Sequence, residues 1–158
     1  MRIKVVCIGK LKEKYWQDAC SEYLKRLSKY SKTSVEEVLE EKIPNETASY
    51  IEIAKKAEGE RILKKVNPND YVVLLEISGQ QINSVQLANL LDDITIKGHS
   101  TIVFVIGGSY GVSEEVKKRA NYKLSFSKLT FPHQMARIMV LEQIYRSFKI
   151  NNNEKYHK

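Results

Sequence analysis

The sequence has few of the residues that build metal centres and disulfides. Of its 158 residues, two are cysteines and three are histidines. Cys7 falls in a strand pattern and Cys20 on the apolar stripe of a helix, so both are expected to be buried free thiols. His99, His133 and His157 lie far apart, and no Cys or His pair has the spacing of a zinc site. We therefore expect neither a disulfide nor a bound metal.

Long apolar runs are also missing. The longest runs have the length of a strand, and a strand pattern begins at once with Met1-Arg2-Ile3-Lys4, which leaves no room for a signal peptide or a membrane span. The apolar content of 42% and the charged content of 28% are ordinary for a globular protein and argue against disorder and a coiled coil. We expect a single domain, residues 1–158, located in the cytoplasm.

Three familiar motifs of nucleotide and hydrolase chemistry are absent. Gly107, Gly108 and Gly111 do not form the dinucleotide fingerprint, and no acidic residue follows about twenty positions later to bind a ribose hydroxyl. Gly9-Lys10 lacks the earlier glycine and the Ser or Thr of a phosphate-binding P-loop. There is no nucleophile elbow. The sequence therefore does not support NAD binding, ATP hydrolysis or a serine hydrolase.

The apolar residues alternate between strand-like and helix-like patterns along the whole chain. Strands are expected at residues 3–8, 34–39, 71–77 and 101–106 and at a short segment near residue 125, with residues 34–39 at an edge of the sheet. Helices are expected at residues 15–27, 48–65 and 84–94, after Gly111 and after Pro132, with Ser84 as an N-cap. This order predicts an α/β fold, a mostly parallel sheet with helices on both faces.

The first of these helices carries an apolar stripe that is expected to face the core. Its members recur in pairs four residues apart, the spacing of one helix face. They are Tyr15, Trp16, Ala19, Cys20, Tyr23, Leu24 and Leu27.

Two loops are expected at one edge of the sheet. The apolar run at residues 101–106 stops at Gly107-Gly108-Ser109-Tyr110-Gly111, and residues 125–134 lead from a second strand into the helix opened by Pro132. The carboxyl ends of parallel strands meet at one edge, where small ligands bind in open α/β sheets. A glycine turn taken alone has a plainer explanation, since glycines at a strand end mostly serve tight turns and close backbone approach.

The positive charge is concentrated at the end of the chain. The formal net charge is +7, and residues 119–158 carry eight lysines and arginines against two glutamates, a local net charge of +6. Such a cluster attracts polyanions, of which nucleic acid is the commonest. A solvated basic surface without a nucleic-acid partner is the alternative.

Taken together, several segments resemble the ribosomal RNA large subunit methyltransferase H family. They are residues 74–79 (LLEISG), 104–111 (FVIGGSYG), 124–133 (LSFSKLTFPH) and 156–158 (YHK), and the similarity extends over the whole chain, including residues 8–12 (IGKLK). The resemblance implies a trefoil-knotted α/β fold of the SPOUT class, active as a homodimer. It also implies methyl transfer from S-adenosylmethionine to N3 of a pseudouridine in 23S rRNA within an assembled ribosome.

The resemblance further implies a cofactor site formed by the central strand and the two loops. Leu75, Leu129 and Phe131 would enclose the adenine, and Gly107 and Gly108 would let the backbone come close to the cofactor. The implied contacts in the second loop are Phe126, Ser127, Lys128, Leu129, Thr130 and Phe131. Plain core packing is the alternative for Leu75 and Phe131, and a role as loop or cap residues is the alternative for Ser127 and Thr130.

Methylation of N3 of a uracil-type ring requires loss of an N–H proton, which directs attention to bases and cations near the cofactor. His133 could accept the proton, and Arg137, one helical turn later, could bind phosphate or the uracil oxygens. At the C-terminus, Tyr156, His157 and Lys158 could supply a stacking ring, a hydrogen-bonding imidazole and a phosphate contact. The alternatives are a helix-start histidine with a structural hydrogen bond and a frayed tail.

The last helix has an apolar face too broad for burial on one side, so it could contact a second subunit or be sandwiched within its own chain. Two other functions stay open from the sequence. One is a ribose 2′-O-methyltransferase of the same fold, and the other is a non-catalytic ribosome-binding factor.

Overall fold

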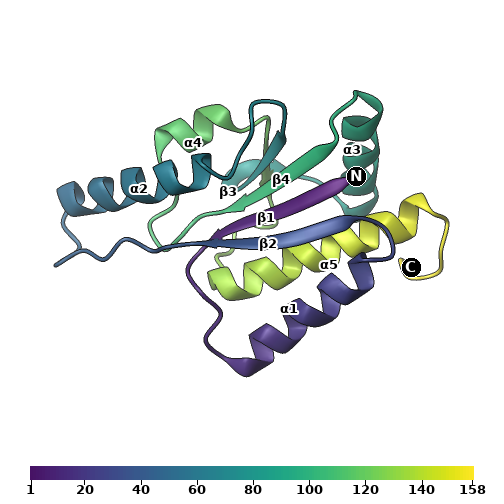
Figure 1. Ribbon diagram of the computed structural model, residues 1–158, viewed down its shortest axis with the longest axis horizontal. Helices are drawn as coiled ribbons and strands as arrows, with labels where there is room; N and C mark the ends of the chain where they lie inside the picture. Colours follow the sequence, from purple (N-terminus) through teal and green to yellow (C-terminus); the bar gives the residue numbers. More distant parts are fainter.

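The computed structural model describes residues 1–158 as an open parallel sheet with helices on both faces (Figure 1). The elements follow one another as β1 (Arg2–Ile8), α1 (Lys14–Leu27), β2 (Lys32–Val38), α2 (Ala48–Leu63), β3 (Tyr71–Gln81), α3 (Ser84–Ile96), β4 (Thr101–Ile106), α4 (Glu114–Arg119), β5 (Tyr122–Ser125) and α5 (His133–Asn151). All strand pairs are parallel, in the order β2-β1-β4-β3-β5. The predicted α/β class, the alternation of elements and the edge position of β2 are confirmed.

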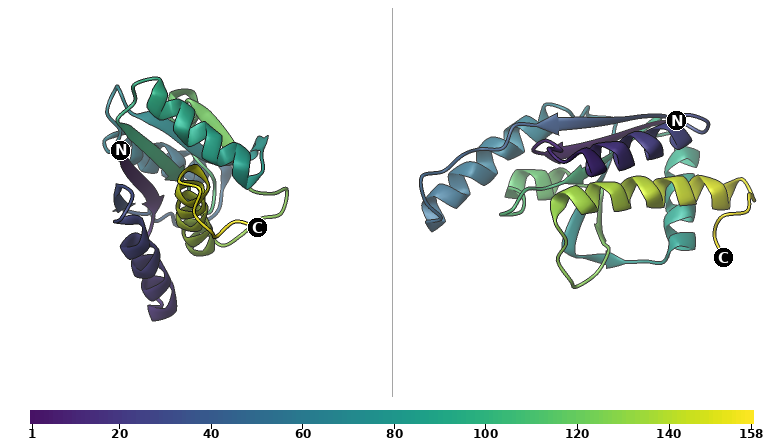
Figure 2. Two further views of the ribbon diagram at one scale, coloured as in Figure 1. Left: turned by 90° about the vertical axis from the view of Figure 1, so that its right-hand side faces the viewer. Right: turned by 90° about the horizontal axis from the view of Figure 1, so that it is seen from below.

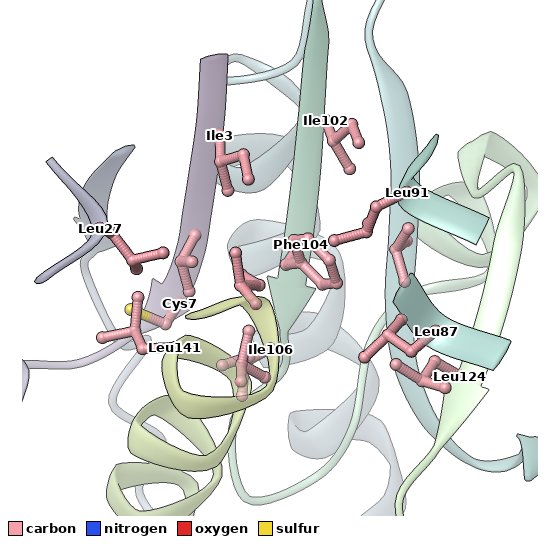
Figure 3. Close-up of a cluster of buried hydrophobic side chains, with 14 of the residues drawn as sticks. Ile3, Cys7, Leu27, Leu87, Leu91, Ile102, Phe104, Ile106, Leu124 and Leu141 are labelled. Carbon is pink, nitrogen blue, oxygen red and sulfur yellow. The ribbon is translucent and has the colours of Figure 1, made fainter. Parts of the chain in front are cut away.

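Two hydrophobic cores lie on the two faces of this sheet. All six residues of β4 are buried, as expected for a central strand covered on both sides. On one face α1, α3 and α5 pack over the sheet, in a cluster that includes Ile3 and Phe104 of the strands and Leu141 of α5 (Figure 3). On the other face α2 and α4 contribute Ile62 and Val116 to a second cluster.

Strand β3 runs four residues further than the sequence pattern indicates. Its register with β5 shifts between Leu75 and Gln80, so the residues between them leave the regular ladder. A Cβ at Gly79 would lie 2.6 Å from the backbone oxygen of Lys123, which explains the glycine at this close approach. The N-cap of α3 is Asn83 and not Ser84, because Asn83 and Gln86 form a reciprocal capping box.

The apolar stripe of α1 is only partly core, contrary to the prediction. Cys20 and Leu27 are its buried residues, whereas Tyr15 is 65% exposed. The reason is that α1 packs on α5 and the edge strand β2, and the helix projects away from the sheet (Figure 2). Its N-terminal half therefore lacks a covering element.

The two cysteines are free and buried, as predicted. Burial raises the pKa of the Cys7 thiol to about 12, against the opposing effect of the Arg137 guanidinium, so this thiol stays protonated at neutral pH. None of the helices combines the length and apolarity that a membrane crossing requires. The trefoil knot implied by the resemblance stays a prediction.

Candidate functional site

A cleft of about 570 Å³ opens at the carboxyl ends of β3, β4 and β5, a volume within the usual range for small-molecule sites. Its walls come from the end of β3, the glycine turn after β4, the loop after β5 and the first turn of α5. The predicted convergence of the two loops at one sheet edge is therefore confirmed.

Most of the residues expected to bind a cofactor lie in this cleft. The lining residues that the sequence singled out are Leu75, Gly107, Gly108, Phe126, Ser127, Leu129, Thr130 and Phe131, together with His133. Lys128 does not line the cleft; it is exposed. The lining contains no lysine or arginine, and Glu76 is its only carboxylate.

The glycine turn owes its glycines to its own packing. A Cβ at Gly107 would lie 2.7 Å from Val112 Cγ1, and one at Gly108 would lie 3.2 Å from Ile8 Cγ2. Gly111 has φ +85°, a conformation that side chains rarely adopt. The plainer explanation of these glycines thus holds, and their lack of side chains also leaves the backbone open toward the cleft.

The loop after β5 is shaped by a short hydrogen-bonded turn. Ser125 Oγ donates to the carbonyl oxygen of Ser127 at 3.1 Å, and Ser127 Oγ accepts from the backbone N–H of Leu129 at 3.0 Å. Ser127 therefore acts as a loop residue, one of the two alternatives. The turn leaves Leu129 71% exposed and Phe131 38% exposed at the cleft rim, where a ligand would cover them.

His133 is the titratable ring of the cleft. It opens α5, is half-buried, and makes no hydrogen bond with another side chain or the backbone of this chain. The alternative of a histidine held by a structural hydrogen bond is therefore not realised here. Pro132, the N-cap of α5, supplies no side-chain hydrogen bond either.

The structure does not bring Arg137 to this cleft. The residue is 2% exposed, and its guanidinium donates to Glu37 Oε2 at 2.8 Å and to the Gly9 carbonyl oxygen at 3.1 Å. Its Nε is buried without a partner. A buried guanidinium bound to β2 and to the end of β1 is not available to phosphate, so the expected RNA contact of Arg137 is corrected to a structural one.

The C-terminal tail packs against α5, so the alternative of a frayed tail is wrong. The Tyr156 ring packs against Tyr145 with centroids 5.0 Å apart, and its hydroxyl donates to Glu142 Oε1 at 3.1 Å. Burial and this hydrogen bond raise the pKa of Tyr156 to about 12. His157 Nδ1 lies 3.4 Å from Arg146 Nη1.

The tail lies at the opposite end of α5 from His133 (Figure 2). Tyr156 and His157 contact Glu142 and Arg146, which follow His133 by 9 and 13 positions, roughly 14 and 20 Å along the helix at about 1.5 Å per residue. Neither tail residue lines the cleft. Within one chain, Tyr156 and His157 are therefore not in the same site as His133.

A second groove of about 670 Å³ runs between α3 and α5. It shares Leu124 and Phe126 with the first cleft, and His157 lies at its edge. Ile138 and Met139 of α5 line this groove, so the apolar face of α5 is only partly covered by its own chain.

Several cleft residues were missed by sequence reasoning. Glu76 and Ile77 belong to the segment where β3 leaves the ladder, a shift that the apolar pattern does not signal. Their position directly after Leu75 is the signal that could have found them. The others are Ile106, Ser109, Gly111, Val112, Leu124, Ser125, Pro132 and Ala136.

Comparison with known proteins points to one family. Residues 1–157 match the family model described as "Predicted SPOUT methyltransferase". The chain is 52% identical to the ribosomal RNA large subunit methyltransferase H of Clostridium novyi and 49% identical to that of Clostridioides difficile, with all of each chain covered.

Solved structures share the fold at lower identity. A tRNA (m1G37) methyltransferase from Aquifex aeolicus has a TM-score of 0.52 and 18% identity, covering 92% of this chain and 70% of its own. A probable methylase family protein from Haemophilus influenzae has a TM-score of 0.52 and 16% identity, covering 99% and 70%.

Proposed function

Because the chain belongs to the SPOUT methyltransferase family and matches the ribosomal RNA large subunit methyltransferase H proteins over its full length, we propose that it methylates rRNA of the large ribosomal subunit. More specifically, we propose methyl transfer from S-adenosylmethionine to N3 of a pseudouridine in 23S rRNA of the assembled ribosome. The observation that carries the proposal is the single cleft that unites the end of β3, the glycine turn and the loop after β5.

The lining of this cleft fits S-adenosylmethionine. A sulfonium cation is compatible with apolar walls and one carboxylate, and is disfavoured by nearby lysines or arginines, of which the lining has none. Leu75, Leu129 and Phe131 offer apolar surface for the adenine, while backbone groups of the glycine turn are free of side chains that would block them. When bound, the cofactor supplies an electrophilic methyl group.

The residues of this chain then have distinct tasks. The cleft walls hold and orient the reactants, which supplies much of the rate in a methyl transfer that needs in-line approach. His133 accepts the N3 proton of the base, since its imidazole has no other partner in the chain. No metal takes part in this proposal.

The separation of His133 from the tail supports a homodimer. Tyr156 and His157 can complete the site of His133 only if they come from a second subunit. The groove between α3 and α5 offers apolar surface for that subunit, and it borders the cofactor cleft through Phe126. We propose that the dimer works on ribosomes in the cytoplasm, without a membrane partner.

Cofactor binding is tested by titration calorimetry with S-adenosylmethionine and a matched pair of variants. Leu129→Ala should weaken binding about tenfold, because an adenine would bury a side chain that is 71% exposed in the free protein. Leu39→Ala is the control, since Leu39 is 70% exposed and lies outside the cleft. Equal affinities for both variants would place the cofactor elsewhere.

The reaction is tested on ribosomes from cells that lack this protein. Nucleoside mass spectrometry of their rRNA, before and after incubation with the protein and S-adenosylmethionine, should show one new base methylation on a pseudouridine. Methylation on the ribose would indicate a 2′-O-methyltransferase. Ribosome binding without methyl transfer would indicate a non-catalytic factor.

A further inference from the structure

The segment from Lys10 to Trp16, which joins β1 to the first turn of α1, has no task in the reaction proposed above. We propose that this segment is a second RNA-contacting surface. The Tyr15 ring stacks on an unpaired rRNA nucleotide close to the one that enters the cleft, and Lys10 and Lys12 bind phosphates beside it. The inference rests on the proposed function, since it assumes an rRNA substrate.

The segment leaves the sheet beside the cleft. β1 and β4 are neighbours with Cys7 paired to Ile106, so β1 ends next to the glycine turn. The side chain of Ile8 lies against that turn, 3.2 Å from the position of a Cβ on Gly108. The first turns of α1 and α5 lie at the same end of the molecule (Figure 1). An RNA that presents a base to the cleft therefore passes close to this segment.

The segment is held in place by hydrogen bonds from distant elements. The Gly9 carbonyl accepts from Arg137 at 3.1 Å, and the Leu11 N–H donates to Glu37 Oε2 at 3.1 Å. Gln17 Nε2 donates to the Leu11 carbonyl at 2.7 Å. A loop fixed in this way loses little conformational entropy on binding, which is the property expected of a recognition surface.

Its side chains have the chemistry of a nucleotide-stacking site. Tyr15 is 65% exposed and its ring centroid lies 5.2 Å from that of Trp16, tilted by 58°. Lys10 and Lys12 are exposed and form no ion pair, whereas Lys14 pairs with Asp18. The N–H groups in the first turn of α1 have no side-chain cap and are free to bind an anion, against the opposing charge of the N-cap residue Glu13.

The proposed reaction exposes bases that such a stacking site can bind. N3 lies on the pairing edge of the base, so the nucleotide has to leave its stack before methylation. The neighbouring bases then lose a stacking partner. An exposed aromatic ring can take the place of that partner, whichever the neighbouring base is. The two unpaired lysines that precede the ring, Lys10 and Lys12, favour RNA over a protein partner or a second copy of this chain.

The stacking contact is tested with Tyr15→Ala in methylation of ribosomes from cells lacking the protein. We expect the KM for ribosomes to rise about tenfold, with kcat, S-adenosylmethionine affinity and melting temperature near those of the wild type. Tyr15→Phe should restore the wild-type KM. Tyr50→Ala is the matched control, because Tyr50 is an exposed tyrosine of α2, on the other face of the sheet. An unchanged KM for Tyr15→Ala would overturn the inference.

The phosphate contacts are tested by the salt dependence of ribosome binding. Neutralising Lys10 and Lys12 together, as Lys10→Gln with Lys12→Gln, should reduce the slope of log affinity against log salt by about 1.4–1.8. Neutralising Lys56 and Lys64, which are exposed at α2 and unpaired, should leave the slope nearly unchanged. Equal slopes for the two double variants would overturn this part of the inference.

Photo-crosslinking distinguishes the partners. With p-azidophenylalanine in place of Tyr15, crosslinks to 23S rRNA are expected, and crosslinks only to a ribosomal protein or to a second copy of the chain would overturn the inference. Failure of the wild type to methylate rRNA would instead refute the proposed function. If the wild type methylates rRNA and the Tyr15→Ala variant has a normal KM, this inference is refuted and the proposed function is not.

Discussion

His133 is the residue on which the proposed proton transfer depends. It lines the cleft from the first turn of α5 and has no hydrogen-bond partner in the chain. The other residues expected around the reacting base are elsewhere in the monomer. Arg137 is buried against Glu37, and Tyr156 and His157 are docked on α5 near Glu142 and Arg146.

Replacing His133 by alanine should lower kcat by about 10²–10⁴, the usual contribution of a positioned general base. The rate is measured at saturating S-adenosylmethionine and ribosomes, so that weak binding is not mistaken for lost chemistry. His99→Ala serves as a control, because His99 contacts Asn69 and Tyr71 away from the cleft. A kcat within a few-fold of the wild type would show that His133 is not the proton acceptor.

Glu58 is a second residue with an unusual environment, behind the glycine turn. It is 5% exposed, its Oε2 accepts from the Glu41 N–H at 3.0 Å, and its Oε1 lies 3.4 Å from the position of a Cβ on Gly108. Burial raises the pKa of this carboxyl, and the nearby Glu40 and Glu41 add to the effect while Arg61 opposes it. Loss of the proton from this carboxyl is therefore harder in the folded protein than in the unfolded chain.

This shift predicts the direction of a pH effect on stability. The pKa of Glu58 is raised in the folded state. Its contribution to the free energy of unfolding is therefore fully present below the ordinary glutamate pKa near 4.3, and it is lost as pH rises through the pKa in the folded protein. Glu58→Gln retains an acceptor for Glu41 and should melt at a higher temperature than the wild type at pH 7, but not at pH 4. The exposed Glu60 of the same helix provides the control, Glu60→Gln, for which little change is expected. A lower melting temperature for Glu58→Gln at pH 7 would contradict the assignment.

Among the secondary-structure elements, helix α5 connects several distant parts of the molecule. It packs on α1 and α3, opens at the cofactor cleft, and reaches the ends of β1 and β2 through Arg137. The Arg137–Glu37 pair joins residues that are 100 positions apart in the chain. These contacts fix the first turn of α5 relative to the loop after β1, and so relate His133 to the proposed RNA-contacting segment.

Loss of this guanidinium should therefore lower stability and leave the salt slope of ribosome binding unchanged, since a buried group contacts no phosphate. Arg137→Ala is expected to lower the free energy of unfolding by about 1.5–3 kcal/mol, the cost of hydrogen bonds that involve a charged group. Arg137→Lys should recover only part of this, since one ammonium cannot reproduce both contacts. Denaturant unfolding measures the first effect, and the salt dependence of ribosome binding measures the second. If stability were unchanged and the salt slope fell by about one, Arg137 would instead be a phosphate contact.

For the molecule as a whole, the main consequence is that one chain holds two separated parts of a proposed site. The cleft lies at the start of α5, and the tail packs on the second half of the helix, at Glu142, Tyr145 and Arg146. The groove between α3 and α5 connects these regions and leaves apolar side chains of α5 uncovered. In the proposed symmetric dimer, each tail would lie at the other cleft and this surface would be covered at the same time.

The dimer predicts complementation between two inactive variants. One is His133→Ala, and the other lacks residues 156–158; each alone should have little activity. After denaturation and refolding of an equal mixture, about one quarter of the wild-type activity should return, because half of the dimers are mixed and each has one complete site. The truncated chain should lose about 1 kcal/mol of stability with the Tyr156–Glu142 hydrogen bond. Mass spectrometry of the mixed dimers confirms exchange, and absence of activity despite exchange would contradict the shared site.

The sequence by itself determined the layers of the fold and the edge at which the cleft forms. The apolar run at residues 101–106 is buried on both faces, and the alternation of strands and helices makes the sheet parallel. Parallel strands place their carboxyl ends at one edge, so the glycine turn and the loop at residues 126–131 lie at the same edge of the sheet. These features follow from local periodicity and chain direction.

Only the tertiary structure decided which side chains those elements cover. The stripe of α1 has the same spacing whether or not another element covers it, and the exposed Tyr15 shows that its first residue lies outside the core. Arg137 has the correct helical phase for the cleft, but its partner is a glutamate 100 residues away in β2. In the sequence, Tyr156 looks like part of a frayed end, whereas in the structure it contacts Glu142 and Tyr145. Periodicity describes the face of an element, whereas burial depends on which distant element packs against that face.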